Sequence, residues 1–331
     1  MRQLLLTITF IVSTAISQEY VDAFLKIGAT PRTISLGQAV VALPQNPGGY
    51  LVNPAASGFS MGRSISGMYI NQFGMADFYS VTTNYQWRSK WQVGLNVVNL
   101  SIDNIAEKPD LRQVIDLETR RDSIRTLVAQ GFTMFRDTET GIFVNLARNF
   151  SVNLDLGWQI TPFSVLIPVG INIKILHKEL YNLIGNGIGF DLGSMLSFRL
   201  SEAIGYDWLG ELTLGFAVTD VIGSMVYWNS GKYENISAGL VTGIAYRQQF
   251  RKMPLDLILL FQDHSIETEH QIGIEAVLKN MIVLRLGNKY GEYTGGLGLK
   301  LKIADIPLSI DYGFSDHDLG NAHRIGGSFT F

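Results

Sequence analysis

Two acid–histidine clusters carry the side chains that acid–base chemistry would need, Asp263-His264 and Asp316-His317-Asp318. A histidine beside a carboxylate can serve as a general base, as a hydrolase at the rim of a membrane protein would require. Aspartate is also favoured in tight turns, and both clusters fall in expected loop tips. We therefore predict a turn role for both and no enzyme activity. A calcium site built on Asp316 and Asp318 would need six or more oxygen ligands.

Other chemistry is restricted by composition. The chain has no cysteine, so it can form no disulfide, thiolate metal site or cysteine nucleophile. Asn46-Pro47-Gly48-Gly49 is rich in glycine but lacks the lysine of a phosphate loop, and we interpret it as a turn. A net charge of −3 gives no strongly basic face for nucleic acid. We predict no cofactor, no metal and no nucleic-acid partner.

The first residues have the pattern of a secretion signal. Arg2 supplies a positive end, Leu4 to Val12 form a short apolar core, and Ala15-Ile16-Ser17 has the spacing of a cleavage site. An uncleaved anchor is the alternative, but the apolar run is shorter than the about 20 residues of a membrane-spanning helix. We expect residues 1–17 to be a signal peptide and the chain to be exported.

Residues 18–59 do not alternate and contain four prolines, Pro31, Pro44, Pro47 and Pro54. Proline cannot donate a hydrogen bond to a strand ladder, so a regular strand is excluded here. We expect an irregular plug-like segment with short helical turns, which lies either below a barrel or in its lumen. A loosely ordered leader is the alternative.

Residues 60–331 alternate repeatedly between apolar and polar or small side chains. Leu297, Leu299 and Leu301, for example, oppose Gly298 and Lys300. The segments are about ten residues long, the length of a tilted strand that crosses a bilayer. We predict an all-β fold, a transmembrane antiparallel β-barrel in the bacterial outer membrane, surrounded by lipid. A soluble sandwich of two packed sheets is the alternative.

The strand count depends on residues 126–161. One parity continues from Gly141 to Ile160, which indicates one long strand and places Thr126–Phe135 in the preceding loop. A break at Arg148-Asn149 would make Thr126–Phe135 a further strand. These readings give 14 or 16 strands, both even as single-chain bacterial barrels require. We prefer 14.

The last strand has an apolar face formed by Ile325, Phe329 and Phe331. An unpaired edge of this kind promotes aggregation, and a closed barrel removes it by pairing the last strand with the first. We expect Arg63–Phe73 to pair with His323–Phe331. Trp87, Trp91 and Trp208 fall near expected turns, as in an interfacial aromatic belt.

Connection lengths predict which end of the barrel faces outward. We expect the longer ones outside: Ser315–Ala322, Asn288–Tyr293, Asp263–Thr268, Thr219–Asn235, His177–Asn186 and, longest of all, Ile102–Ile124. The short ones, expected in the periplasm, are Ala304–Asp305, Lys279–Asn280 and Phe250–Lys252. Ser201–Leu209 is a long periplasmic exception.

Charged residues are expected to face the lumen at ten positions, five acidic and five basic. They are Lys174, Asp191, Glu211, Asp256, Glu275, Arg285, Lys300, Lys302, Asp311 and Arg324. A wide ion-selective porin would carry an excess of one sign, whereas a balanced set can form pairs between strands. We favour a plugged or narrow lumen over a water-filled one.

The chain resembles the PorV/PorQ group of outer-membrane proteins within the FadL-like barrels. The resemblance rests on Gly28-Ala29, Leu36-Gly37, Asn53-Pro54-Ala55 and the closing His323–Phe331, with Asp191-Leu192-Gly193 and Trp228–Gly231 between them. Thr30-Pro31 departs from the family pattern, in which arginine follows Ala29 directly.

The resemblance implies a plug motif at Gly28, Gly37, Asn53, Pro54 and Ala55, and a last strand recognised by the barrel-assembly machinery. It further implies either passage of hydrophobic small molecules or a role as an outer-membrane component of type IX protein secretion, with secretion-system components as partners. An outer-membrane hydrolase and a general porin are the alternatives.

Overall fold

The structure is a computed structural model. It describes residues 23–331 except 61, 109, 113, 115, 156, 158–161, 251, 266–269 and 318–319. The expected signal peptide, the first five residues of the expected plug segment, Pro109, Trp158, Ile160, Thr268 and Asp318 lie outside the described residues.

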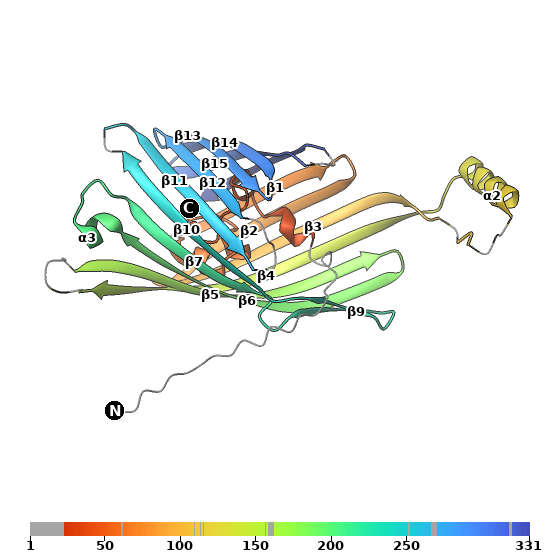
Figure 1. The fold of residues 1–331 in the computed structure, drawn as a ribbon, viewed down its shortest axis with the longest axis horizontal. Helices are drawn as coiled ribbons and strands as arrows, with labels where there is room; N and C mark the ends of the chain where they lie inside the picture. Colours follow the sequence, from red (N-terminus) through yellow and green to blue (C-terminus); the bar gives the residue numbers. More distant parts are fainter. Residues whose placement is uncertain are drawn as a thin grey trace, which may run out of the picture.

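Fourteen antiparallel strands form a closed barrel (Figure 1). They are β1 (Arg63–Gln72), β2 (Ala76–Arg88), β3 (Trp91–Ala106), β4 (Met134–Leu154), β5 (Phe163–Leu180), β6 (Leu183–Arg199), β7 (Glu211–Thr219), β10 (Gly239–Phe250), β11 (Leu255–His264), β12 (Gln271–Leu278), β13 (Ile282–Lys289), β14 (Glu292–Ile303), β15 (Ile306–Ser315) and β16 (Ala322–Thr330). The two remaining strands, β8 (Ser224–Trp228) and β9 (Tyr233–Ile236), form a hairpin on the outer end of β6. The predicted count of 14 is confirmed.

The barrel closes where the chain's first and last strands meet. Ile65 lies opposite Phe329 and Tyr69 opposite Ile325. The N–H groups of Arg63 and Phe331 each donate to the other residue's carbonyl over 2.8 Å. The expected pairing is therefore confirmed, and Ile325 and Phe331 remain 67% and 63% exposed on the outer face.

The outer face of the wall is apolar on strand after strand. Ile188, Phe190 and Leu192 of β6 point outward, while Asp191 between them is buried. The N-terminal segment and the inward side chains occupy the interior of the barrel, so the outward apolar side chains have no protein layer to pack against among the described residues. Lipid is the natural environment of such a surface. The protein is an outer-membrane β-barrel. Among the described residues, no helix is both long enough and apolar enough to span a membrane.

The connections on the outer side range from two residues to a segment that carries a helix. The longest outer one, residues 107–133, carries helix α2 (Leu117–Gln130), which extends away from the barrel at the tips of β3 and β4 (Figure 1). On the periplasmic side, α3 (Leu200–Ile204) occupies the long connection after β6. The prediction of a long outer connection is wrong at two places. Tyr181 and Asn182 alone join β5 to β6, and Tyr290 and Gly291 alone join β13 to β14.

Strand β4 explains the uncertain count. It runs unbroken through Arg148-Asn149 and pairs with β5 from Asp137 to Leu154. Residues before Met134 belong to the outer connection; α2 takes the first half of the segment that would have been an extra strand, and Met134 and Phe135 begin β4. The strand ends at Leu154, earlier than the predicted Ile160.

The N-terminal segment lies inside the barrel, and residues 23–60 are named the plug below. Its helical turns are η1 (Leu25–Ile27), α1 (Pro31–Ser35), η2 (Gly49–Leu51) and η3 (Pro54–Phe59). Thr30 caps α1 and Asn53 caps η3 through their side chains, each followed by proline at the first helical position. That position suits proline, because the N–H it lacks would have no helical partner. Local sequence thus defines both turns.

Glycines on the inner wall let the plug backbone approach the strands. A Cβ at Gly215 of β7 would overlap the carbonyl of Val41, and one at Gly170 of β5 would overlap that of Pro54. Strand glycines at which a Cβ would come within 3.0 Å of the plug are Gly94, Gly141, Gly170, Gly193, Gly215, Gly243, Gly273, Gly287, Gly296, Gly313 and Gly326. This belt accounts for part of the high glycine content, since glycine permits close approach of a second backbone.

Candidate functional site

The outer half of the lumen contains a cluster of buried apolar side chains. Phe24 and Tyr50 of the plug are fully buried against Phe78 of β2 and Leu176 of β5. Val226 and Ile236 of the β8–β9 hairpin belong to the same cluster. Burial of large side chains of this kind stabilises the packing by roughly 1.5–3 kcal/mol each. The plug and the outer loops therefore share one core.

A row of polar side chains on three adjacent strands holds the plug at mid-height. Asn145, Asn172 and Asp191 lie on one rung of β4, β5 and β6. Asn172 donates to the carbonyl of Tyr50 over 2.7 Å, and Asn145 donates to that of Pro54 over 3.0 Å. These bonds satisfy plug carbonyls that water cannot reach.

Asp191 also belongs to a buried charge cluster. The ammonium of Lys174 lies 2.8 Å from Asp191 and 2.6 Å from Asp220, which begins the outer connection after β7. Burial raises the pKa of Asp220, and the neighbouring Lys174 opposes that shift. The carboxylate of Asp220 also accepts a hydrogen bond from the hydroxyl of Ser224 at the start of β8. The cluster ties the outer hairpin to the wall.

Arg32 of the plug makes a salt bridge to the opposite wall. Its guanidinium donates two hydrogen bonds to Glu275 of β12, of 2.8 and 2.7 Å. Glu275 also accepts from Arg285 of β13 over 2.7 Å, and Arg285 donates to Asp311 of β15 over 2.6 Å. These four residues are named the latch. It joins plug and wall through charge, with the Glu275 and Arg285 side chains each 1% exposed.

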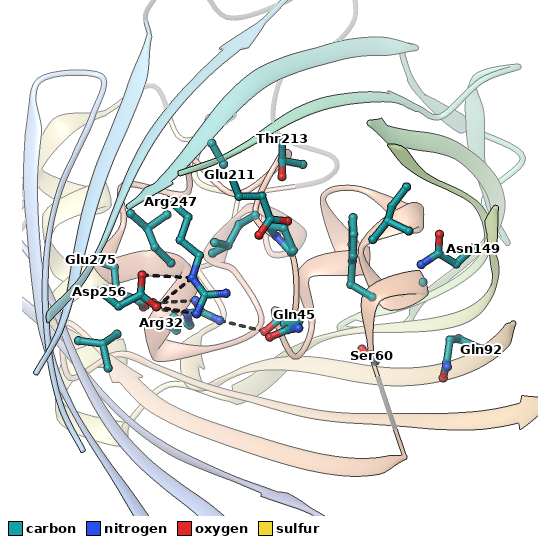
Figure 2. A pocket seen from close by; sticks show the side chains of 18 of the residues that line it. Arg32, Gln45, Ser60, Gln92, Asn149, Glu211, Thr213, Arg247, Asp256 and Glu275 are labelled. Carbon is teal, nitrogen blue, oxygen red and sulfur yellow. Dashed lines mark hydrogen bonds and ion pairs between the residues drawn. The ribbon is translucent and has the colours of Figure 1, made fainter. Parts of the chain in front are cut away.

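Beneath the plug, near the periplasmic ends of the strands, lies a cavity of about 400 Å³, named the vestibule. Figure 2 shows its two sides. Arg32, Glu275, Arg247 and Asp256 lie together on one side, and Gln92 and Asn149 lie on the other. Arg247 pairs with Asp256 over 2.5 Å, so the charged side is internally neutralised.

The other predicted lumen charges vary in position. Glu211 lines the vestibule and accepts from Ser197 over 2.7 Å. Lys300 lines it as well, and Arg324 is buried where it donates to Ser315 over 2.7 Å. Lys302 is the exception, because it pairs with Asp305 at the exposed periplasmic turn. The remaining charges are held in pairs, as a balanced set allows.

The plug-motif residues lie at turns and contacts of the plug. Gly28 and Gly37 have φ of 91° and 61°, and a Cβ at Gly37 would overlap the backbone of Asn288 on β13. Asn53 donates to the carbonyls of Val41 and Ser194. Pro54 and Ala55 are buried in η3. No catalytic chemistry follows from these positions.

The acid–histidine clusters lie on the outer rim. Asp263 contacts His270 Nδ1 over 2.9 Å, and His317 Nε2 lies 3.4 Å from Glu292. All four side chains are exposed and come from strand ends or loops. Within the described residues, no group of three His, Asp or Glu side chains could hold a metal ion.

Three residues of the site were not predicted from the sequence. Arg32 and Asp220 are key partners of predicted lumen charges, and Arg247 pairs with Asp256. Alternation could have indicated Arg247, which shares the inward parity of β10 with Val241 and Ala245. Nothing in the local sequence links Arg32 to Glu275, because they lie 243 positions apart.

No family model matches the chain, and no curated protein matches it. Among solved structures, the toluene transporter TbuX of Ralstonia pickettii is similar with a TM-score of 0.43 and 11% identity, over 91% of this chain and 97% of that one. A FadL homologue of Pseudomonas aeruginosa gives 0.41 and 9%, over 91% and 96%. Omp33 of Acinetobacter baumannii gives 0.36 and 9%, over 83% and 100%. The fold itself is defined by the closed order of its fourteen strands.

Proposed function

We propose that the protein lets small hydrophobic molecules cross the outer membrane through a lumen that its plug keeps closed to water and ions. The observation that carries the proposal is the apolar cluster in the outer half of the lumen, to which the fully buried Phe24, Tyr50, Phe78 and Leu176 belong. A general porin needs a polar, water-filled channel along its whole length. The paired charges of the latch give the plug a fixed closed position.

Passage requires the plug to shift. Its contacts consist of apolar packing, hydrogen bonds and the salt bridge of Arg32 to Glu275, none of them covalent. A hydrophobic solute that enters the outer core can replace apolar contacts of the plug at little cost, whereas an ion cannot. The arrangement thus favours apolar solutes over charged ones.

Vesicles with a lipopolysaccharide outer leaflet provide the test, because that leaflet slows the entry of hydrocarbons. We expect vesicles containing the protein to take up toluene faster than empty vesicles, with sugar entry unchanged. Equal toluene entry with and without the protein contradicts the proposal. Rapid entry of sugars would favour the general porin instead.

A role in type IX secretion is a second candidate, favoured by the PorV/PorQ-like segments and by one structural feature. Helix α2 lies on the outer connection, and none of its residues is buried. Such an extension suits contact with another protein outside the membrane. Copurification of secretion-system components, lost when residues 107–133 are shortened, would support this role. Purification without them from cells that secrete through this route would contradict it.

A further inference from the structure

Two amide side chains of the vestibule have unused hydrogen-bonding atoms. Gln92 of β3 is 3% exposed, and its Oε1 has no hydrogen-bond partner among the described residues. The Oδ1 of Asn149 on β4 is also buried and has no hydrogen-bond partner among the described residues. Both line the cavity, and Figure 2 shows them beside each other on its neutral side. Buried polar atoms without partners are rare and costly, so they indicate a missing ligand.

Register explains why the two amides are neighbours. Gln92 lies opposite Ala147, and Asn149 follows two residues later on the same inward side of β4. Residues in this diagonal relation have Cα atoms roughly 7–8 Å apart. One small polar group placed between them can therefore reach both.

Three other polar side chains of the vestibule already have partners. Gln86 lines the same cavity, but its Oε1 accepts from the N–H of Gly62 over 3.1 Å and its Nε2 donates to the carbonyl of Ser89 over 3.3 Å. Arg32 and Arg247 are neutralised by Glu275 and Asp256. The unpartnered buried oxygens of this cavity thus belong to neutral amides.

Apolar side chains adjoin the two amides. Phe59 of the plug is 8% exposed and packs in one cluster with Leu166 of β5. Both residues line the vestibule. Asn149 lies opposite Pro168 of β5, and Leu166 precedes Pro168 by two positions on that strand. A ligand with its polar group at the amides would therefore rest its apolar body on Phe59 and Leu166.

Unpartnered polar atoms continue up the same wall. They are Oδ1 of Asn84 on β2, Oδ1 of Asn96 on β3 and Oγ of Ser66 on β1. Gln86 pairs with Gln92, Asn84 with Gly94, and Thr82 with Asn96, so these atoms lie at successive levels from the vestibule toward the outer side. The row offers further polar contacts along the plug.

We propose that the vestibule binds a neutral amphiphile with a hydroxyl group, such as a phenol or an alcohol, and that this is the substrate class of the proposed passage. The inference rests on that proposed function. A hydroxyl can donate its one proton to the unpartnered oxygen of one amide, Gln92 or Asn149, and accept a hydrogen bond from the NH2 group of the other amide. A carboxylate only accepts and would face their oxygens, while a bare hydrocarbon would leave them unpaired.

Three probes that share one ring test the proposal, namely p-cresol, 4-methylbenzoate and toluene. Their dissociation constants are measured on the full protein in lipid nanodiscs, with empty nanodiscs as the blank. We expect p-cresol to bind about tenfold more tightly than toluene and more tightly than 4-methylbenzoate. Equal binding of p-cresol and toluene, or preference for 4-methylbenzoate, would overturn the proposal without any variant.

Variants assign the preference to the two amides. The double variant Gln92→Met and Asn149→Leu keeps side-chain size and should weaken p-cresol about tenfold while leaving toluene unchanged. Gln86→Met alters a satisfied amide of the same cavity and should keep the preference. Unchanged p-cresol binding in the double variant overturns the site. Toluene uptake by vesicles then separates failure of this substrate class from failure of the proposed passage. Protein-dependent toluene uptake persists if only the substrate class is wrong, and it is absent if the proposed function itself fails.

Discussion

The two halves of the lumen share one wall but differ in what their inward positions carry. On β2, Phe78 points inward near the outer end, and Asn84 points inward nearer the periplasm. The outer half contains a packed cluster of apolar side chains, whereas the periplasmic half leaves a cavity of about 400 Å³ between charged pairs and neutral amides. The plug touches both. The difference indicates that the outer half forms the closure and the periplasmic half forms the binding space.

Removing an outer core side chain should have the largest effect. Phe78→Ala leaves a cavity in the cluster that Phe24 and Tyr50 of the plug complete, and such a change costs about 3–5 kcal/mol. Phe216→Ala is the control, because Phe216 is 49% exposed on the lipid-facing side, where lipid chains can refill the space. Urea unfolding in lipid vesicles measures both, and equal losses would refute a shared outer core.

Breaking the latch should have the next largest effect. Arg32→Gln leaves Glu275 with Arg285 as its remaining partner, and the loss of charged hydrogen bonds costs about 1.5–3 kcal/mol. Arg247→Gln borders the same vestibule but breaks a pair between two wall strands. Hydrogen exchange at plug amides should accelerate in the first variant and not in the second. Equal acceleration in both would show that Arg32 has no special role in holding the plug.

A side chain added to the glycine belt should have the smallest effect on stability and a specific effect on closure. Gly215→Val places a side chain where the carbonyl of Val41 lies, and overpacking of this kind costs about 1–3 kcal/mol. We expect the displaced plug to admit ion current across planar bilayers. Gly67→Val is the control, since a Cβ there meets Ser80 only at 3.8 Å. Absence of current in Gly215→Val would mean that the plug does not depend on the belt.

Strand alternation makes the wall predictable from sequence, because each inward and outward position leaves a local signature. Ile325, Phe329 and Phe331 thus predict closure against β1, and the single parity around Arg148 predicts the long β4. Turn length is less predictable. Tyr181 adopts a positive φ of 55° in the tight β5–β6 connection, although tyrosine does not favour that conformation.

The contacts of the plug are the part that sequence does not supply. Arg32 finds Glu275 only because the closed ring brings β12 to α1. Asp220 joins Lys174 through the outer connection, and the unpaired oxygens of Gln92 and Asn149 can be recognised only once every neighbouring donor is placed. These are non-local relations, which no periodicity encodes.

Thiol labelling tests the central claim most directly, since the chain has no cysteine of its own. Ser60→Cys introduces a thiol in the vestibule, and Val98→Cys introduces one in the outer core, where Val98 is 2% exposed. A membrane-impermeant thiol reagent is applied from either side of oriented vesicles. We predict that Ser60→Cys reacts from the periplasmic side alone and that Val98→Cys reacts from neither side. Reaction of Ser60→Cys from the outer side would contradict a lumen closed in its outer half.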